Sequence, residues 1–309
     1  MLKLKLKNSL SSILFWSVIS AAFIGPGTVT TAASAGSAYG FDLIWVLLIS
    51  TFACIVLQIN VTQITIQTGL TLGELLLAKF KNYKFIPISL GVSIVFGCAA
   101  YQAGNLLGAT IGLNLIFEIE ARWILLMIVI LASAMLWFGS IKVVVRTLGS
   151  IVAVLGITVI FIAFSIDLNF YDILKSSLIP KIPANSEIIV MGLIGTTIVP
   201  YNLFLGSGLS KGKSYSASRF GLIVAISLGG LISISILLSG TLVSTPFNFE
   251  KLSMELIEQI GPWANYLLGI GLFSAGFTSA MTAPLAAVFT MKSIFSNHKK
   301  LNDRNSMSY

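Results

Sequence analysis

Long apolar runs are the feature that most limits what this chain can fold into. Of its 309 residues, 56% are hydrophobic and only 10% are charged, whereas soluble domains carry about 25% charged residues. Apolar stretches of about 20 residues match the hydrocarbon core of a bilayer when they are helical. The runs are continuous and do not alternate between apolar and polar residues, which argues against a β-barrel. We therefore expect an all-α, multi-pass membrane protein.

The apolar runs predict eight membrane spans in one transmembrane bundle, residues 1–291, followed by a polar cytoplasmic tail, 292–309. The expected spans are residues 11–40, 43–68, 86–116, 121–140, 147–166, 186–209, 220–243 and 263–291. Thr71 and Glu74 have the spacing of a capping box, which predicts a short helix after the second span. Residues 249–260 have an apolar and an acidic face and predict an amphipathic helix at the outer interface. The polar segment 167–187 is expected to be an external loop.

The positive charges gather near alternate span ends. Fifteen of the 19 lysines and arginines fall on one side of the expected topology. They are Lys3, Lys5, Lys7, Lys79, Lys81, Lys84, Lys142, Arg146, Lys211, Lys213, Arg219, Lys292, Lys299, Lys300 and Arg304. We expect the chain to span the cell membrane, and the positive-inside rule then places both termini in the cytoplasm. The net charge of +8 therefore reflects topology and attraction to anionic membrane lipid, and it does not indicate a nucleic-acid site.

Gly25-Pro26-Gly27-Thr28 interrupts the first expected span. Proline lacks an N–H group and crowds the carbonyl one turn back, and glycine leaves helical angles at low cost. A second interruption centres on Pro200, in another apolar span. Broken helices at bilayer depth expose backbone groups that persist only inside protein or beside a wet cavity. Two breaks in matching positions indicate a transporter's binding site, and two ordinary proline kinks are the alternative.

Gln102 and Asn105 are the notable uncharged amides within a span, and their spacing puts them on one helix face. They either face a site or form interhelical hydrogen bonds. We find no acidic or basic residue deep in any span, and the single histidine, His298, lies in the tail. Without a catalytic motif we expect neither an enzyme nor a cofactor. The lack of intramembrane acids also argues against a proton relay.

The two interruptions, together with several flanking motifs, resemble the Nramp (natural resistance-associated macrophage protein) family of divalent-metal transporters. The residues that carry the resemblance are Gly25-Pro26-Gly27-Thr28, Gly36, Leu43 to Trp45, Leu57-Gln58, Thr68-Gly69, Ile194 to Leu205, Gly271 to Gly276 and Thr278-Ser279. The resemblance implies a LeuT-type inverted-repeat bundle of five helices plus five, with discontinuous helices 1 and 6 holding the metal between them. Residues 1–166 would form the first repeat, and residues 186–291 would form an incomplete second repeat. Three explanations would account for the missing last helices. The chain is a truncated gene product, or a partner or a missing segment supplies those helices, or the chain is not a working carrier.

The chain departs from the family at the positions that the resemblance implies for metal binding and proton movement. The family's first-helix motif is Asp-Pro-Gly-Asn, in which the acid and the amide both bind metal. In this chain those two positions are Gly25 and Thr28. In the sixth helix, Ala-x-x-Met-Pro-His becomes Thr196-x-x-Val199-Pro200-Tyr201, so the thioether that favours soft transition metals is lost. The third-helix acids implicated in proton movement correspond to Gln102 and Asn105.

We therefore predict a carrier of the Nramp superfamily that moves a divalent metal, as a hydrated ion such as magnesium, by alternating access. The alternatives are a carrier for a neutral or monovalent polar solute and a non-transporting, truncated homologue. The expected substrate-binding residues are Gly25, Thr28, Thr31, Gln102, Asn105, Thr196, Val199 and Tyr201. The expected helix-breaking residues are Pro26, Gly27 and Pro200. The candidate metal ligands are the carbonyls of Gly25 and Thr196 and the side chain of Thr28.

Overall fold

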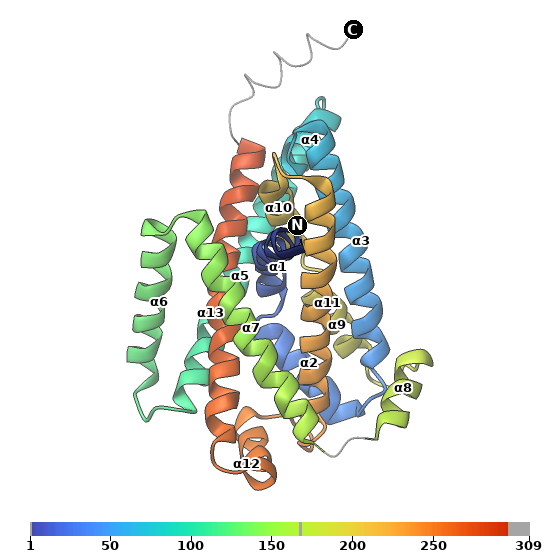
Figure 1. Cartoon of the computed structure of the whole chain (residues 1–309), viewed down its shortest axis with the longest axis vertical. Coiled ribbons are helices and arrows are strands. Elements are labelled where there is room, and N and C mark those ends of the chain that lie inside the picture. Colours follow the sequence, from blue (N-terminus) through green and yellow to red (C-terminus); the bar gives the residue numbers. More distant parts are fainter. Residues whose placement is uncertain (1, 167–168, 296–309) are drawn as a thin grey trace.

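A computed structural model describes residues 2–166 and 169–295, and every regular element in that part of the chain is an α-helix (Figure 1). The helices are α1 (Leu2–Phe23), α2 (Pro26–Tyr39), α3 (Ile44–Thr68), α4 (Leu72–Lys79), α5 (Phe85–Asn114), α6 (Ala121–Phe138), α7 (Ile141–Ser165), α8 (Phe170–Leu178), α9 (Glu187–Thr197), α10 (Pro200–Ser210), α11 (Tyr215–Gly240), α12 (Phe249–Ile260) and α13 (Ala264–Phe295). Within the described residues, seven helices are long and apolar enough to cross a membrane, or eight when the bent pair α1–α2 counts as one span. The predicted all-α, multi-pass membrane bundle is confirmed.

Apart from α1, the long helices run up and down between two ends of the bundle (Figure 1). The short helix α4 and the connection from α10 to α11 lie at one end, while α8 and α12 lie at the other. The α4 end carries Lys79, and the α10–α11 connection carries Lys211 and Lys213. Basic connections therefore meet at one end of the bundle, as alternating spans require.

Close helix approach in the core depends on small residues, as is usual between membrane helices. A Cβ at Gly36 of α2 would overlap the carbonyl oxygen of Leu237 in α11, and one at Gly276 of α13 would overlap the backbone nitrogen of Ala109 in α5. No side chain fits at these crossings, so α2 packs on α11 and α13 packs on α5 almost backbone to backbone.

Two spans begin earlier than their apolar runs predict. Helix α7 starts at Ile141, where we expected residue 147, because Ser140 caps it and accepts a hydrogen bond from the backbone nitrogen of Val143 at 3.4 Å. Helix α11 starts at Tyr215, where we expected residue 220. The added turns contain charged or hydroxyl-bearing residues, Lys142 and Arg146 in α7 and Ser216, Ser218 and Arg219 in α11, so a hydropathy pattern alone does not include them in a span.

The prediction that 167–187 is only a loop was wrong. It contains α8, which starts after Asn169, whose side chain accepts a hydrogen bond from the backbone nitrogen of Tyr171 at 3.1 Å. Residues 167 and 168 lie outside the described part. Helix α13 continues to Phe295, so the predicted tail from residue 292 begins within a helix, and residues 296–309 are likewise outside the described part.

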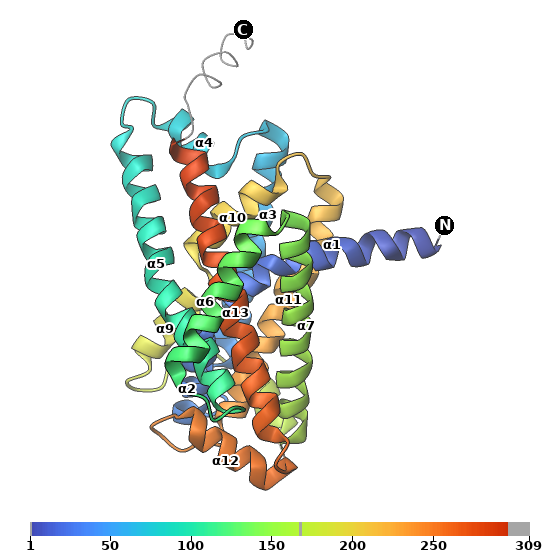
Figure 2. The same cartoon turned by 90° about the vertical axis from the view of Figure 1, so that its left-hand side faces the viewer.

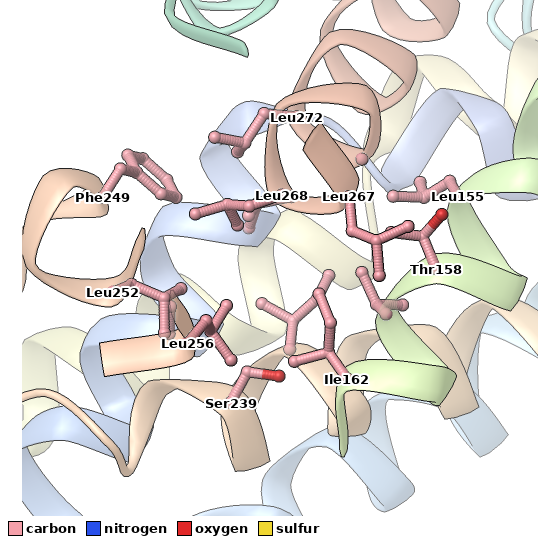
Figure 3. Close-up of a pocket in the computed structure, with 15 residues that line it drawn as sticks. Leu155, Thr158, Ile162, Ser239, Phe249, Leu252, Leu256, Leu267, Leu268 and Leu272 are labelled. Atoms are coloured by element: carbon pink, nitrogen blue, oxygen red, sulfur yellow. The ribbon is translucent and has the colours of Figure 1, made fainter. Parts of the chain in front are cut away.

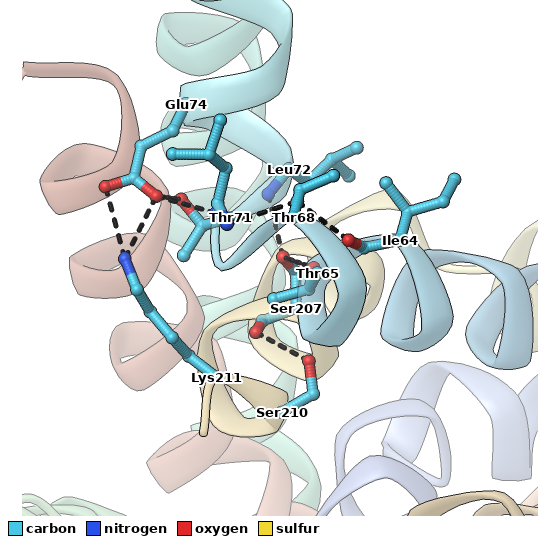
Figure 4. A network of polar contacts seen from close by, with 10 residues as sticks. Ile64, Thr65, Thr68, Thr71, Leu72, Glu74, Ser207, Ser210 and Lys211 are labelled. Atoms are coloured by element: carbon cyan, nitrogen blue, oxygen red, sulfur yellow. Dashed lines mark hydrogen bonds and ion pairs between the residues drawn. The ribbon is translucent and has the colours of Figure 1, made fainter. Parts of the chain in front are cut away.

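The predicted capping box is present and belongs to a larger polar network (Figure 4). Glu74 accepts hydrogen bonds from the backbone nitrogen of Thr71 at 2.6 Å and from its hydroxyl at 2.9 Å. The ammonium of Lys211, just after α10, lies 3.2 Å from the same carboxylate. Ser207 of α10 accepts a bond from the backbone nitrogen of Leu72 at 2.7 Å and shares another with Thr65 at 2.8 Å. These contacts fix α4 and the end of α3 to α10.

Candidate functional site

The first predicted break lies between α1 and α2. Helix α1 ends at Phe23, Gly25 is extended with φ −107° and ψ 177°, and Pro26 is the first residue of α2. Proline suits this position because a first-turn N–H has no helical acceptor in any case. The segments on the two sides are bent by 58°, and α1 runs across the bundle and emerges from its side (Figure 2). Pro26 is therefore not an ordinary kink within a continuous helix.

The second break is milder. Helix α9 ends at Thr197, α10 begins with Pro200 at its first position, and Ile198 and Val199 lie between them. The two helices together form one 24-residue span from Glu187 to Ser210. Both predicted discontinuities are thus present, at corresponding places in the first and sixth spans.

The break in α1 leaves carbonyls without helical N–H partners, and side chains fill that role. The Tyr201 hydroxyl donates to the carbonyl of Ala22 at 2.6 Å, and the Ser279 hydroxyl donates to that of Ala21 at 3.1 Å. The Thr28 hydroxyl donates to the carbonyl of Phe23. A buried carbonyl with no partner costs about 1–3 kcal/mol. Three hydroxyls, from α10, α13 and α2, therefore stabilise the frayed end of α1.

A small cavity of about 20 Å³ lies at the meeting point of the two breaks, which is room for a single water molecule. It is lined by Ala22, Phe23, Gly25, Gly27, Thr28, Tyr101, Asn105, Thr196, Val199, Tyr201 and Ser279. Six of the eight predicted substrate-binding residues are in this lining, and only Thr31 and Gln102 are not. No lining residue carries a formal charge, so the cavity is polar but neutral.

Thr31 and Gln102 point to other partners. A Cβ at Gly192 of α9 would lie 3.0 Å from the Cγ2 atom of Thr31, so Thr31 packs against α9 beyond the cavity. The side-chain nitrogen of Gln102 donates to the carbonyl of Ala280 in α13 at 3.1 Å. For Gln102, the interhelical hydrogen bond that we kept as the alternative is present. Its carbonyl oxygen is buried with no partner in the described structure.

The candidate metal-ligating groups are already engaged within the chain. The carbonyl of Gly25 accepts the first backbone bond of α2, from Val29 at 3.0 Å. The carbonyl of Thr196 lies 3.4 Å from the Thr28 hydroxyl. Each carbonyl still has a second lone pair. The described residues contain no group of three or more His, Cys, Asp or Glu residues placed to hold a metal ion.

The amide of Asn105 marks the wall of the cavity on α5. Asn105 is only 4% exposed, and its side-chain nitrogen has no hydrogen-bond partner among the residues that the structure describes. Unpaired buried polar atoms are rare, and they commonly indicate a water or ligand that completes their bonding. A Cβ at Gly25 would lie 3.2 Å from the Asn105 side-chain oxygen and 2.8 Å from the Ser279 hydroxyl. Glycine at position 25 thus leaves the space on which the cavity depends.

Sequence reasoning missed two polar residues of the lining, Tyr101 and Ser279. The ring of Tyr101 meets that of Tyr201 edge-on, with centroids 5.7 Å apart. Ser279 lies in the serine- and threonine-rich middle of the last span. Composition predicts that this segment is polar, but it does not predict which side chain faces α1. That segment is part of the unbroken helix α13 and is buried.

A second cavity has the opposite character (Figure 3). It measures about 30 Å³ and lies among α2, α7, α11, α12 and α13. Leucines from α7, α12 and α13 surround it, and its only side-chain hydroxyls are those of Thr158 and Ser239. An apolar hollow of this kind offers nothing to a polar solute, so the cavity at the breaks is the candidate site.

Comparison with known proteins agrees with the architecture. The profile of the family "Natural resistance-associated macrophage protein-like" matches residues 17–308. The divalent metal cation transporter MntH of Verminephrobacter eiseniae is 25% identical over 89% of this chain and 66% of its own length. The metal transporter Nramp3 of Oryza sativa is 26% identical over 93% of this chain and 56% of its own length. This chain thus spans about two thirds of the first relative and just over half of the second.

Solved structures show the same fold. A crystal structure of a mutant manganese transporter from Eremococcus coleocola superposes with a TM-score of 0.80 at 18% identity, covering 94% of this chain and 66% of that one. The predicted LeuT-type bundle with discontinuous helices 1 and 6 is confirmed. Because the family profile matches residues 17–308, which is nearly the whole chain, this chain belongs to the natural resistance-associated macrophage protein-like family.

Proposed function

We propose that the protein is a carrier that moves a divalent metal cation across the cell membrane by alternating access. The observation that carries the proposal is the convergence of both broken spans on one neutral, polar cavity. Broken helices at corresponding positions of two repeats form the substrate sites of many transporters. Residues 1–166 and 186–291 would be the two repeats that move around this site. The printed names of the relatives, which describe divalent metal and manganese transporters, support the same substrate class.

The cation in this proposal keeps most of its hydration shell. A hard dication that loses its water requires carboxylate oxygens in exchange, and the lining has none. Thr28, Thr196 and Tyr201 provide hydroxyls, and Asn105 provides an amide, which can hydrogen-bond to bound water. The cavity holds about one water in this conformation. Binding would therefore require the α1–α2 break to open further, with Thr31 and Gln102 reaching the substrate only then.

A neutral or monovalent polar solute is the second candidate. The lack of any charged side chain in the lining favours it. A membrane orientation with both chain ends in the cytoplasm accompanies either candidate, since the basic connections at the α4 end would then face the cytoplasm.

Uptake into proteoliposomes separates the possibilities. We expect saturable uptake of at least one of Mn²⁺, Mg²⁺ and Ca²⁺, and we expect Thr28→Val to reduce it about tenfold or more, since a hydrogen-bonding oxygen in the lining is lost. Thr158→Val, which removes a buried hydroxyl from the apolar cavity, is the matched control and should leave uptake near the parent value. Failure to take up any of the three ions, together with thermal stabilisation by a neutral solute or a monovalent ion, would reject the divalent-metal proposal.

A further inference from the structure

Three polar side chains are buried between α3 and α10, beside the candidate site but separate from it. Gln58 and Thr62 lie one turn apart on α3, and Asn202 lies in the first turn of α10. Each of the three is at most 1% exposed, and none of them lines the cavity at the breaks. Polar groups buried this deeply are normally paired. We call these three residues the α3–α10 polar cluster.

Hydrogen bonds fix the orientation of both amides in the cluster. The side-chain nitrogen of Gln58 donates to the backbone carbonyl of Asn202 at 2.9 Å, and the side-chain nitrogen of Asn202 donates to that of Ile19 in α1 at 3.0 Å. Turning either amide around would place its oxygen against a carbonyl oxygen, and neither of these atoms can donate. Both amides therefore direct their nitrogens onto backbone carbonyls and keep their oxygens free.

Three oxygen atoms of the cluster lack a hydrogen-bond partner within the part of the chain that the structure describes. They are Oε1 of Gln58, Oδ1 of Asn202 and Oγ1 of Thr62. The next threonine on this face of α3 differs, because the Thr65 hydroxyl shares a 2.8 Å hydrogen bond with Ser207 of α10 (Figure 4). An unpaired buried polar atom costs about 1–3 kcal/mol. Three of them on facing turns of two helices therefore indicate a ligand that pairs with oxygen.

The free oxygens of α3 lie on the face that meets α10. A Cβ at Gly206 would overlap Oε1 of Gln58, so the Gln58 amide extends over one turn of α10, with its nitrogen at Asn202 and its oxygen toward Gly206. Thr62 lies between Gln58 and Thr65 on α3, and both of those residues bond to α10. The Thr62 hydroxyl thus belongs to the same helix face.

We propose that the α3–α10 polar cluster binds a monovalent cation, Na⁺ or K⁺. Uncharged oxygens alone can replace the hydration shell of such an ion, as carbonyl oxygens do in selectivity filters. A dication requires carboxylate oxygens, and the cluster has none. Water is the other ligand of suitable chemistry, but water pairs equally well with amide nitrogen. An arrangement in which both nitrogens are turned away and only oxygens remain free favours a cation.

A bound cation would link three helices. Its ligands come from α3 and α10, and the Asn202 amide also holds the carbonyl of Ile19 in α1. The ion should therefore stabilise the fold in proportion to its occupancy. This expectation does not depend on which substrate the carrier moves, so it can be tested without a transport assay.

Thermal unfolding of the purified full-length chain in detergent tests the proposal, in NaCl, KCl and N-methyl-D-glucamine chloride at equal ionic strength. We expect Na⁺ or K⁺ to raise the unfolding midpoint saturably, by about 3 °C or more. Thr62→Val removes one ligand oxygen and keeps the side-chain shape, so it should weaken the apparent affinity for the ion about tenfold. Thr65→Val, one turn further along α3, removes a paired hydroxyl and is the matched control. It should lower the midpoint in every salt and leave the affinity unchanged.

Two further variants at position 62 keep the test decisive if Thr62→Val does not fold. Thr62→Ala also lacks the hydroxyl and should lose affinity, whereas Thr62→Ser retains the hydroxyl and should bind the ion as the parent does. Equal midpoints in the three salts would reject the cation and leave water as the ligand. An ion-dependent rise with unchanged affinity in the hydroxyl-free variants would place the ion elsewhere. A larger rise with Mg²⁺ than with Na⁺ and K⁺, lost in these variants, would assign the cluster to a dication.

Discussion

The two broken spans satisfy their backbone in different ways. At the second break the repair is local: Ile198 donates its N–H to the carbonyl of Ile194 at 2.8 Å, and the Thr197 hydroxyl donates to that of Leu193 at 2.8 Å. At the first break, two of the three hydroxyl donors come from far along the chain, Tyr201 of α10 and Ser279 of α13. The α9–α10 break therefore satisfies most of its backbone locally, with one longer contact of 3.4 Å from the Thr28 hydroxyl to the Thr196 carbonyl, whereas the end of α1 depends more on distant neighbours. A motion that separates α1 from α10 and α13 would expose carbonyls to the cavity.

The largest expected effect comes from the packing that holds the first break in place. Gly108 of α5 lies against Pro26, and a Cβ there would overlap the proline ring, which cannot rotate away. Gly108→Ala should destabilise the protein by about 1–3 kcal/mol through overpacking, seen as a lower midpoint of thermal unfolding in detergent. Gly104→Ala, one turn earlier on the same helix, has open space around it and is the control. Equal midpoints for the two variants would show that α5 does not hold Pro26.

A smaller effect is expected from the glycines at the two breaks themselves. Gly25→Ala places a Cβ 2.8 Å from the Ser279 hydroxyl, which must then rotate away from its carbonyl partners. We expect a loss of about 1–2 kcal/mol from the broken hydrogen bond and crowding. Gly195→Ala near the second break has no atom within 4 Å of the new Cβ and should be neutral or slightly stabilising. Comparable thermal midpoints for the two variants would remove the distinction between the breaks.

The hydrogen bond by which Tyr201 of α10 caps the end of α1 can be tested by removing the Tyr201 hydroxyl. Tyr201→Phe keeps the ring but leaves the carbonyl of Ala22 without its 2.6 Å hydrogen bond, which should cost about 1 kcal/mol. Tyr101→Phe, in the ring that packs edge-on against Tyr201, is the matched control. Thermal unfolding of both variants decides: a loss confined to Tyr201→Phe supports long-range capping, and equal losses would point to the ring pair.

The smallest effect concerns the end of the α9–α10 span, where Glu74 of α4 pairs with Lys211 at 3.2 Å. Burial alone raises the pKa of Glu74, but hydrogen bonds from Thr71 and the Lys211 ammonium outweigh it and lower the pKa below its usual value. A lowered pKa stabilises the fold above the unfolded-state pKa of about 4.3 and ceases to do so as pH falls through the folded-state value. Glu74→Gln should therefore cost about 0.5 kcal/mol at pH 7, and this cost should shrink as pH falls below the unfolded-state pKa. A thermal-midpoint difference between parent and variant that is constant from pH 7 to 3 would contradict this.

Much of the helical layout could be predicted from the sequence because it depends on local chemistry. Apolar length set the spans, and Pro26 and Pro200 set the two breaks, since proline at a first helical position needs no N–H acceptor. The capping box of Thr71 and Glu74 followed from three-residue spacing. Helix α8 escaped prediction because it is only nine residues long, and its cap at Asn169 is a weak local signal.

The members of the candidate site were harder to predict. Thr28 and Thr31 are one turn apart, yet only Thr28 lines the cavity, because α9 passes beside Thr31 at Gly192. Gln102 and Asn105 share a helix face, but α13 accepts a hydrogen bond from Gln102 and leaves Asn105 at the cavity. Helical periodicity states which residues of one helix lie together. It does not predict which residues of the neighbouring helices they contact.

By itself, the sequence determined that this chain is a bundle of membrane-spanning helices, where two of them break, and that the broken ends carry hydroxyls and no charge. These follow from hydropathy, proline geometry and residue type, which act within a few residues. Only the tertiary structure decided that Tyr201 and Ser279 would cap the end of α1, that Gly25 would face Asn105, and that α1 would cross α11 beside Lys213. Those outcomes depend on how helices far apart in the sequence pack, since buried backbone groups take whichever partner the packing brings within reach.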